Sequence, residues 1–170
     1  MTSIPEARRQ EVVEQLKKIP VFEALAHNEE SLTELLKIGS LKAYRRGEEI
    51  IQEGDVGSQM YVVISGAVEI QKRTRAGDNY TVVILRAENH VFFGELALID
   101  DDKRSATVVA TEDSEFLVIH KNDFDALGDT HPGIGLPVTR AIAKILASRL
   151  RKTTGDMLTI FDALVSEIKD

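Results

Sequence analysis

The side chains best suited to bind a small anion lie in residues 93–108, FGELALIDDDKRSATV. Gly94 has no side chain, so its backbone can approach a ligand closely. Leu96 to Ile99 can form one helical turn whose free N–H groups face an anion. Arg104 offers a permanent positive charge and a planar fork of donors for phosphate oxygens. The segment therefore predicts a loop that binds a phosphate.

Two further residues follow the arginine, and a carboxylate precedes it. Ser105 adds a hydroxyl and Ala106 leaves its N–H accessible. Glu95 would be repelled by a phosphate, so its natural partner on the same ligand is a hydroxyl, which a ribose provides. The inferred ligand is a sugar phosphate. Taken alone, a glutamate and an arginine nine residues apart are usually solvated surface charges, so the prediction depends on the whole string.

This string closely resembles the phosphate-binding cassette of the cyclic nucleotide-binding domain family. The resemblance extends upstream through residues 54–70, GDVGSQMYVVISGAVEI, which are similar to the glycine-punctuated strands of the family's β-roll. It implies that Glu95 accepts the ribose 2′-hydroxyl and that Arg104 pairs with the cyclic phosphate. It also places Ile70 and Ile84 at positions that line the family's base pocket. Both isoleucines would look the same if they were only core residues.

The elements that must position this loop can be read from the apolar spacing. A first helix, ended by Pro20, is predicted by apolar side chains at helical spacing at Val12, Val13, Leu16 and Ile19. A tight turn and a second helix are predicted after it by Val21, Phe22, Leu25, Leu32, Leu35 and Leu36. Between Leu41 and Ile119, short β-branched runs alternate with turn residues, as in an antiparallel roll or barrel. The runs are residues 49–51, 61–64, 68–70, 81–85, 107–109 and 116–119. Turn glycines separate them at Gly47, Gly54, Gly57 and Gly66, and residues 75–79 read as a hairpin tip.

We therefore expect an α+β fold in which an antiparallel β-roll, of the double-stranded β-helix or jelly-roll type, is flanked by helices. The whole chain, residues 1–170, is expected to form one domain. Residues 1–38 would form the N-terminal helices, residues 39–120 the roll with its cassette, and residues 121–170 the C-terminal helices.

A long amphipathic pattern from Ile134 to Ile168 predicts a C-terminal helix. A helix continuing to the end of the chain would be about 55 Å long, longer than the about 35–40 Å of a compact body of the preceding residues. Its apolar residues follow a nearly heptad spacing, at Leu146, Leu150, Thr153, Met157, Ile160, Leu164 and Ile168. An overhanging helix would expose this stripe unless a second copy covered it, which predicts a parallel homodimer.

The same helix carries a segment similar to the lid of the catabolite activator group. Arg149-Leu150 followed by Thr153-Thr154 implies that the two threonines close over the adenine from both subunits. The alternative is that both threonines face solvent or the helix seam. Gly155 departs from the group's pattern and indicates a possible hinge, because a mid-helix glycine costs about 1 kcal/mol relative to alanine.

Composition excludes several classes of protein. The chain has no cysteine, and its four histidines show no ligand spacing, so we expect neither a metal nor a cofactor. Asp100-Asp101-Asp102 reads as a solvated loop. No apolar run approaches the roughly 18 residues of a membrane span, and no signal peptide is evident, so we expect a cytoplasmic protein without membrane contact. A net charge of −7 argues against direct DNA binding.

Two functions fit these observations. The first is a cyclic nucleotide sensor that transmits its state to a downstream protein, which the sequence does not name. Ser105 gives the Arg-Ser-Ala string of the catabolite activator group, which favours cAMP over cGMP. The alternative is a dimerising scaffold on the same fold with an unused pocket. An enzyme is not expected, because there is no nucleophile motif and Glu95 has no second catalytic carboxylate beside it.

Overall fold

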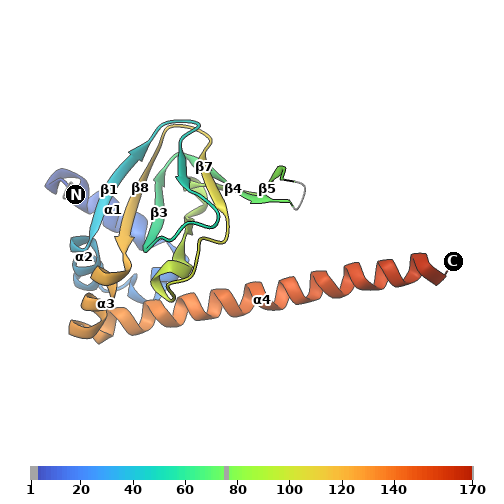
Figure 1. The fold of residues 1–170 in the computed structure, drawn as a ribbon. Coiled ribbons are helices and arrows are strands. Elements are labelled where there is room, and N and C mark those ends of the chain that lie inside the picture. The colour runs from blue at the N-terminus through green and yellow to red at the C-terminus, as the bar shows by residue number, and fades with distance from the viewer. Residues whose placement is uncertain (1–3, 75–76, 170) are drawn as a thin grey trace.

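The computed structural model describes residues 4–74 and 77–169, and it confirms the predicted fold class. Two antiparallel sheets form a roll, the shorter helices gather on one side of it, and a long helix runs beneath the roll and extends beyond it (Figure 1). Residues 75–76 of the expected hairpin tip lie outside the described residues. The strands on either side of it pair as a hairpin, with Arg73 opposite Asn79.

The N-terminal segment forms α1 (Glu6–Leu16), the 3₁₀ helix η1 (Pro20–Leu25) and α2 (Glu29–Lys37). Asn28 caps α2, because its side chain accepts a hydrogen bond from the N–H of Ser31. The valine, leucine and phenylalanine side chains of all three helices are buried and belong to one hydrophobic core.

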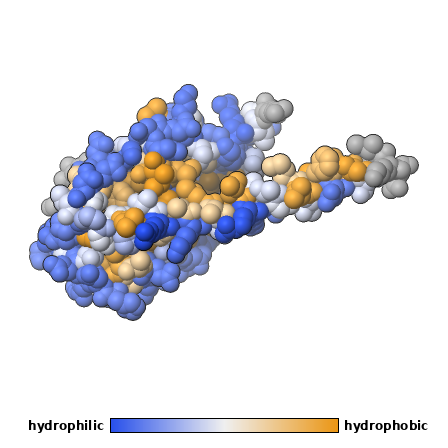
Figure 2. All heavy atoms as spheres, turned by 90° about the horizontal axis from the view of Figure 1, so that it is seen from below, coloured by the Kyte–Doolittle hydropathy of each residue, from blue (hydrophilic) through white to orange (hydrophobic). Residues whose placement is uncertain are grey.

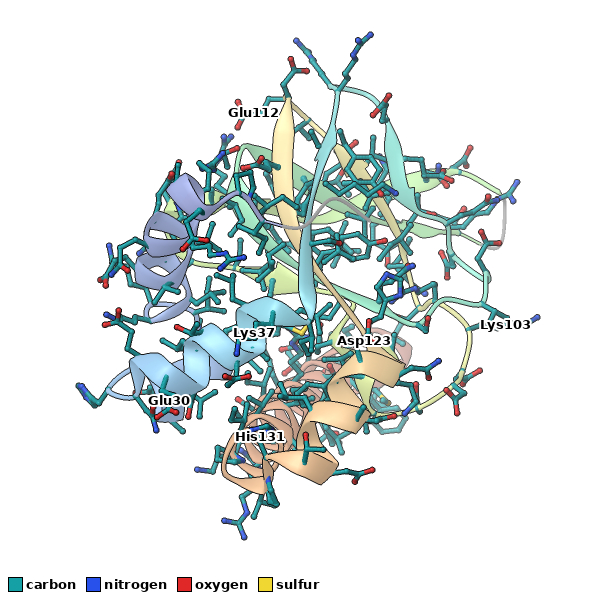
Figure 3. The ribbon with its side chains drawn as sticks, turned by 90° about the vertical axis from the view of Figure 1, so that its left-hand side faces the viewer. Glu30, Lys37, Lys103, Glu112, Asp123 and His131 are labelled. Carbon is teal, nitrogen blue, oxygen red and sulfur yellow. The ribbon has the colours of Figure 1, made fainter. Side chains whose placement is uncertain are left out.

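Eight strands make two four-stranded sheets. The first has the order β1-β8-β3-β6 and the second the order β2-β7-β4-β5. Their bounds are β1 Gly39–Tyr44, β2 Glu49–Ile51, β3 Gln59–Ser65, β4 Ala67–Arg73, β5 Asn79–Arg86, β6 Phe92–Phe93, β7 Thr107–Ala110 and β8 Ser114–His120. The turn between β7 and β8, at Glu112, lies at one end of the body, and His131, directly after helix α3 (Lys121–Thr130), lies at the other (Figure 3).

Strands β3 and β8 are buried on both faces. Met60 and Val62 pack with the helices, whereas Tyr61 and Val63 face the interior of the roll. A strand covered on both sides needs apolar side chains at every position, which explains the unbroken run MYVVI. The first sheet is thus a shared wall between the helical core and the core of the roll.

Helices α3 (Lys121–Thr130) and α4 (Pro132–Lys169) complete the chain. The two helices approach closely through glycines, since a Cβ on Gly135 would lie 2.5 Å from the Cα of Gly128. α4 has 38 residues, which corresponds to about 57 Å. It passes through Gly155 without a break, so the structure shows no hinge there.

The part of α4 beyond the body presents apolar side chains to solvent (Figure 2). Leu150, Met157, Ile160 and Leu164 of the predicted seam are each more than half exposed. Leu146 instead packs partly against the body. The side chain of Ile168 lies outside the described residues.

Candidate functional site

A cavity of about 570 Å³ opens between the predicted cassette, the β4–β5 hairpin and α4. Small-molecule sites typically have about 300–1,000 Å³. The cassette contributes Gly94, Glu95, Leu96, Arg104, Ser105 and Ala106 to its lining. The expected phosphate and ribose contacts therefore surround one space, although ten residues or more separate some of them in the sequence.

Gly94 makes the turn that brings the cassette to the sheet. Its φ of +74° lies in the left-handed region, and a Cβ there would lie 2.9 Å from the carbonyl oxygen of Gln59. Only glycine meets both demands without strain. The 3₁₀ turn η3 follows at Glu95–Leu98, one residue earlier than the helical turn predicted from the sequence.

An aromatic cluster fixes the strand before this turn. The rings of Tyr61 and Phe93 stack with centroids 5.0 Å apart, and Phe116 meets both rings edge-on. Such pairs contribute about 0.5–1.5 kcal/mol each beyond burial. Burial raises the pKa of Tyr61 to about 12, so its hydroxyl is neutral beside the cassette at physiological pH. The cluster therefore gives the loop a rigid base without adding charge.

Arg104 is buried and lines the cavity. Its guanidinium donates to the carbonyl oxygens of Gln59, at 2.7 Å, and Gly94, at 3.3 Å. Burial lowers its pKa, and the nearby Tyr61 and Glu95 oppose that effect; arginine stays protonated in proteins. Its hydrogen-bond partners are neutral carbonyls, and no carboxylate of residues 4–74 and 77–169 forms an ion pair with it. A bound anion would therefore meet a cation without a direct counter-ion among these residues.

Gly57, which the sequence indicates only as a turn glycine, lies against this guanidinium. A Cβ at Gly57 would be 2.5 Å from Nε of Arg104, and its φ is not in the left-handed region. The close approach of the backbone to the arginine is thus what favours glycine at this position.

Glu95 is 3% exposed, and its Oε1 accepts a hydrogen bond from Nη1 of Arg149 on α4. Its Oε2 forms no hydrogen bond among the described residues. It is also not sealed inside the protein, since the one such orphaned side-chain atom in the described ranges belongs to Gln15. Glu95 lines the cavity, so a carboxylate oxygen without a protein partner is available there to a ligand hydroxyl.

Arg149 is a contact of the site to which sequence reasoning assigned no role. It follows the buried Ile142 by two helical turns and the half-buried Ile145 by one. It therefore continues the stripe of α4 that faces the body. A cation on a body-facing stripe is the signal that could have identified it.

The apolar side of the cavity comes from the β4–β5 hairpin. Ile70 lines it as expected, but Ile84 does not, and its neighbours Val83 and Leu85 take that place. A β-bulge after Ile70 puts Val83 opposite Ile70 and Ile84 opposite Glu69. Successive side chains of a strand face opposite sides, so the register turns Ile84 outward.

Thr153 and Thr154 are exposed on α4 and do not line the cavity of their own chain. The hydroxyl of Thr154 donates to the carbonyl oxygen of Leu150 in the same helix. Within one chain the structure therefore does not bring the expected lid to the site, and a lid contact would have to come from a second copy.

The acidic triplet 100–102 lies in an exposed loop before Lys103, whose side chain points to solvent (Figure 3). Among the described residues, no three His, Cys, Asp or Glu side chains are grouped so that they could hold a metal ion. None of the helices in residues 4–74 and 77–169 is both long and apolar enough to cross a membrane.

An antiparallel roll with a buried arginine, a buried carboxylate and an apolar wall around one cavity fits a class of small-molecule-binding domains. The sequence pattern described as "Cyclic nucleotide-binding domain" matches residues 41–131, more than half of the chain. The chain belongs to the cyclic nucleotide-binding domain family.

Individual relatives show the same likeness. The chain is 34% identical over 137 residues to the "Cyclic AMP receptor protein" of Thermus thermophilus, covering 81% of this chain and 60% of that protein. It is 32% identical over 126 residues to "cGMP-dependent protein kinase 2" of Mus musculus, covering 74% of this chain and 16% of the kinase. The crystal structure of the Thermus thermophilus catabolite activator protein superimposes with a TM-score of 0.72 at 33% identity, covering 81% of this chain and 61% of that one. The chain thus spans less than two thirds of each.

Proposed function

We propose that this chain is a sensor domain that binds cAMP in preference to cGMP and passes the bound state through α4 to a partner protein. The observation that carries the proposal is that Arg104 and Glu95 line the same cavity. A buried cation that has no direct counter-ion in the described part of the chain suits the cyclic phosphate. A buried carboxylate with one open oxygen suits the ribose 2′-hydroxyl. The domain binds its ligand and releases it unchanged, without a reaction of its own.

The base would lie against Ile70, Val83 and Leu85 on the hairpin side of the cavity. Phosphate and ribose are common to cAMP and cGMP, so only contacts with the base edge can discriminate between them. Ser105, in an Arg-Ser-Ala string, supports cAMP. The named relatives include a receptor for cyclic AMP and a kinase dependent on cGMP, so both ligands belong in the test.

The ion pair between Glu95 and Arg149 supports the proposed transmission. It connects the carboxylate that would hold the ribose directly to α4. A ligand that engages Glu95 would therefore change the stability of the contact between α4 and the body, and with it the affinity of α4 for a partner. By thermodynamic linkage, the bound partner would change the affinity for the ligand by the same factor. We place this sensor in the cytoplasm.

We also propose that two copies form a parallel dimer through α4. The exposed apolar residues of its extension support this, because an uncovered stripe of that length is unusual on a monomer. A second copy would also bring its own Thr153 and Thr154 toward the cavity.

Isothermal titration of the purified chain with cAMP and cGMP tests the proposal. We expect saturable heat with both ligands and tighter binding of cAMP. Arg104→Ala should weaken cAMP binding by about ten- to a hundredfold, because a charge-assisted contact contributes about 1.5–3 kcal/mol. The absence of heat with either nucleotide would favour a scaffold with an unused pocket. Tenfold tighter binding of cGMP would overturn the preference.

A further inference from the structure

A lysine outside the cavity lining joins the β4–β5 hairpin to the cassette. The ammonium of Lys72 lies 2.5 Å from the carbonyl oxygen of Ser105 and 2.5 Å from Oε1 of Glu53. Glu53 is itself fixed, since its N–H donates to Oγ1 of Thr107 and its Oε2 accepts from the N–H of Arg73. The lysine is thus held in place by a carboxylate while it binds the cassette backbone.

The backbone groups from Arg104 to Ala106 differ in whether they have a protein partner. The N–H of Arg104 donates to the carbonyl of Asp55, and its own carbonyl accepts from the N–H of Gly54. The Ser105 carbonyl is taken by Lys72. Within residues 4–74 and 77–169, no protein group accepts from the N–H of Ser105 or of Ala106. An N–H group without a protein acceptor is a donor available to a ligand.

The Ser105 carbonyl and the Ala106 N–H belong to one peptide plane, and in a trans peptide they point in opposite directions. Lys72 draws the carbonyl toward a side chain that does not line the cavity, whereas Ala106 does line it. We infer that Lys72 is a positioning residue, which orients the Ser105–Ala106 peptide so that the Ala106 N–H is presented to the phosphate of the ligand.

A direct ionic role for Lys72 fits the structure less well. Its ammonium already has two close oxygen partners. Lys103, Arg104 and Arg149 line the cavity, whereas Lys72 does not. Lys72 therefore acts on the ligand through the peptide that it holds.

This inference rests on the proposed function, and two readouts separate them. Lys72→Met removes the ammonium but keeps a side chain of similar length, and Lys72→Arg keeps the charge. Lys18→Met is the matched control, because Lys18 is exposed and has no hydrogen bond or ion pair among the described side chains. Each variant and the parent are titrated with cAMP, and the ¹⁵N–¹H resonance of Ala106 is followed with and without ligand.

We expect Lys72→Met to bind cAMP about tenfold more weakly, Lys72→Arg to retain most of the affinity, and Lys18→Met to match the parent. The Ala106 resonance should move already in ligand-free Lys72→Met, and cAMP should shift it less than in the parent. Parental affinity in Lys72→Met, or a loss of affinity without any change at Ala106, would overturn the inference. If the parent itself does not bind cAMP, the proposed function fails, and the ligand-free spectra still decide whether Lys72 orients the peptide.

Discussion

Replacing Arg149 with methionine would remove the one side-chain partner that the Glu95 carboxylate has among the described residues. Methionine keeps most of the length and apolar surface of the arginine, so packing of α4 against the body should persist. The substitution therefore isolates the ion pair from the helix contact.

The burial of the two side chains sets the expected magnitude. At an effective dielectric constant of about 20, unit charges about 4 Å apart attract by about 4 kcal/mol. The Arg149 side chain is 57% exposed, whereas that of Glu95 is 4% exposed. Solvent screening of the arginine removes most of this attraction, which leaves about 1 kcal/mol for the free energy of unfolding. That corresponds to a melting temperature lower by about 2–4 °C.

The expected effect of Arg149→Met on ligand affinity comes from the conformational freedom of the Glu95 side chain rather than from the lost charge. A Glu95 carboxylate released from Arg149 can rotate, and fixing such a side chain again costs about 0.5–1.5 kcal/mol. Affinity for cAMP should therefore fall about three- to tenfold. Affinity for 2′-deoxy-cAMP should hardly change, because this ligand lacks the hydroxyl that Glu95 would bind.

Titration calorimetry with both ligands measures this difference, and Arg151→Met provides a control. Arg151 is an exposed arginine on the same helix, without a hydrogen bond or ion pair among the described side chains. An Arg149→Met variant that keeps the full preference for cAMP over its deoxy analogue would refute the positioning role. A gain in cAMP affinity would show that Arg149 competes with the ribose for Glu95.

Three further predictions follow from α4. Gly135→Ala should lower the free energy of unfolding by about 1–3 kcal/mol, because its Cβ would meet the backbone of α3; in thermal denaturation, Gly133→Ala, which meets nothing within 4 Å, should show no loss. Analytical ultracentrifugation should find a dimer at micromolar concentration, with Met157→Glu shifting it toward monomer; a monomeric parent contradicts the proposed interface. The double variant Thr153→Val, Thr154→Val should narrow the affinity ratio of cAMP to cGMP, and an unchanged ratio would exclude the lid.

The cassette could be predicted from the sequence because its geometry is local. Residue 94 must be glycine because its φ is positive and because a Cβ would clash with the carbonyl oxygen of Gln59. The run from Met60 to Ile64 is apolar because both faces of the strand are covered. Backbone steric limits determine which residue types a position accepts, and the spacing of apolar residues shows which faces of an element are buried. The sequence by itself therefore predicts the roll, the cassette and the long C-terminal helix, because none of these predictions requires knowing which distant residues are in contact.

The remaining contacts depend on how distant elements meet. A bulge of one residue decides that Val83 and Leu85, rather than Ile84, face the cavity. Arg149 reaches Glu95 only because α4 runs straight beneath the roll, and Lys72 reaches Ser105 only because the hairpin lies beside the cassette. Strand register and helix docking are set by packing over the whole domain, since a shift of one residue reverses every side chain of a strand.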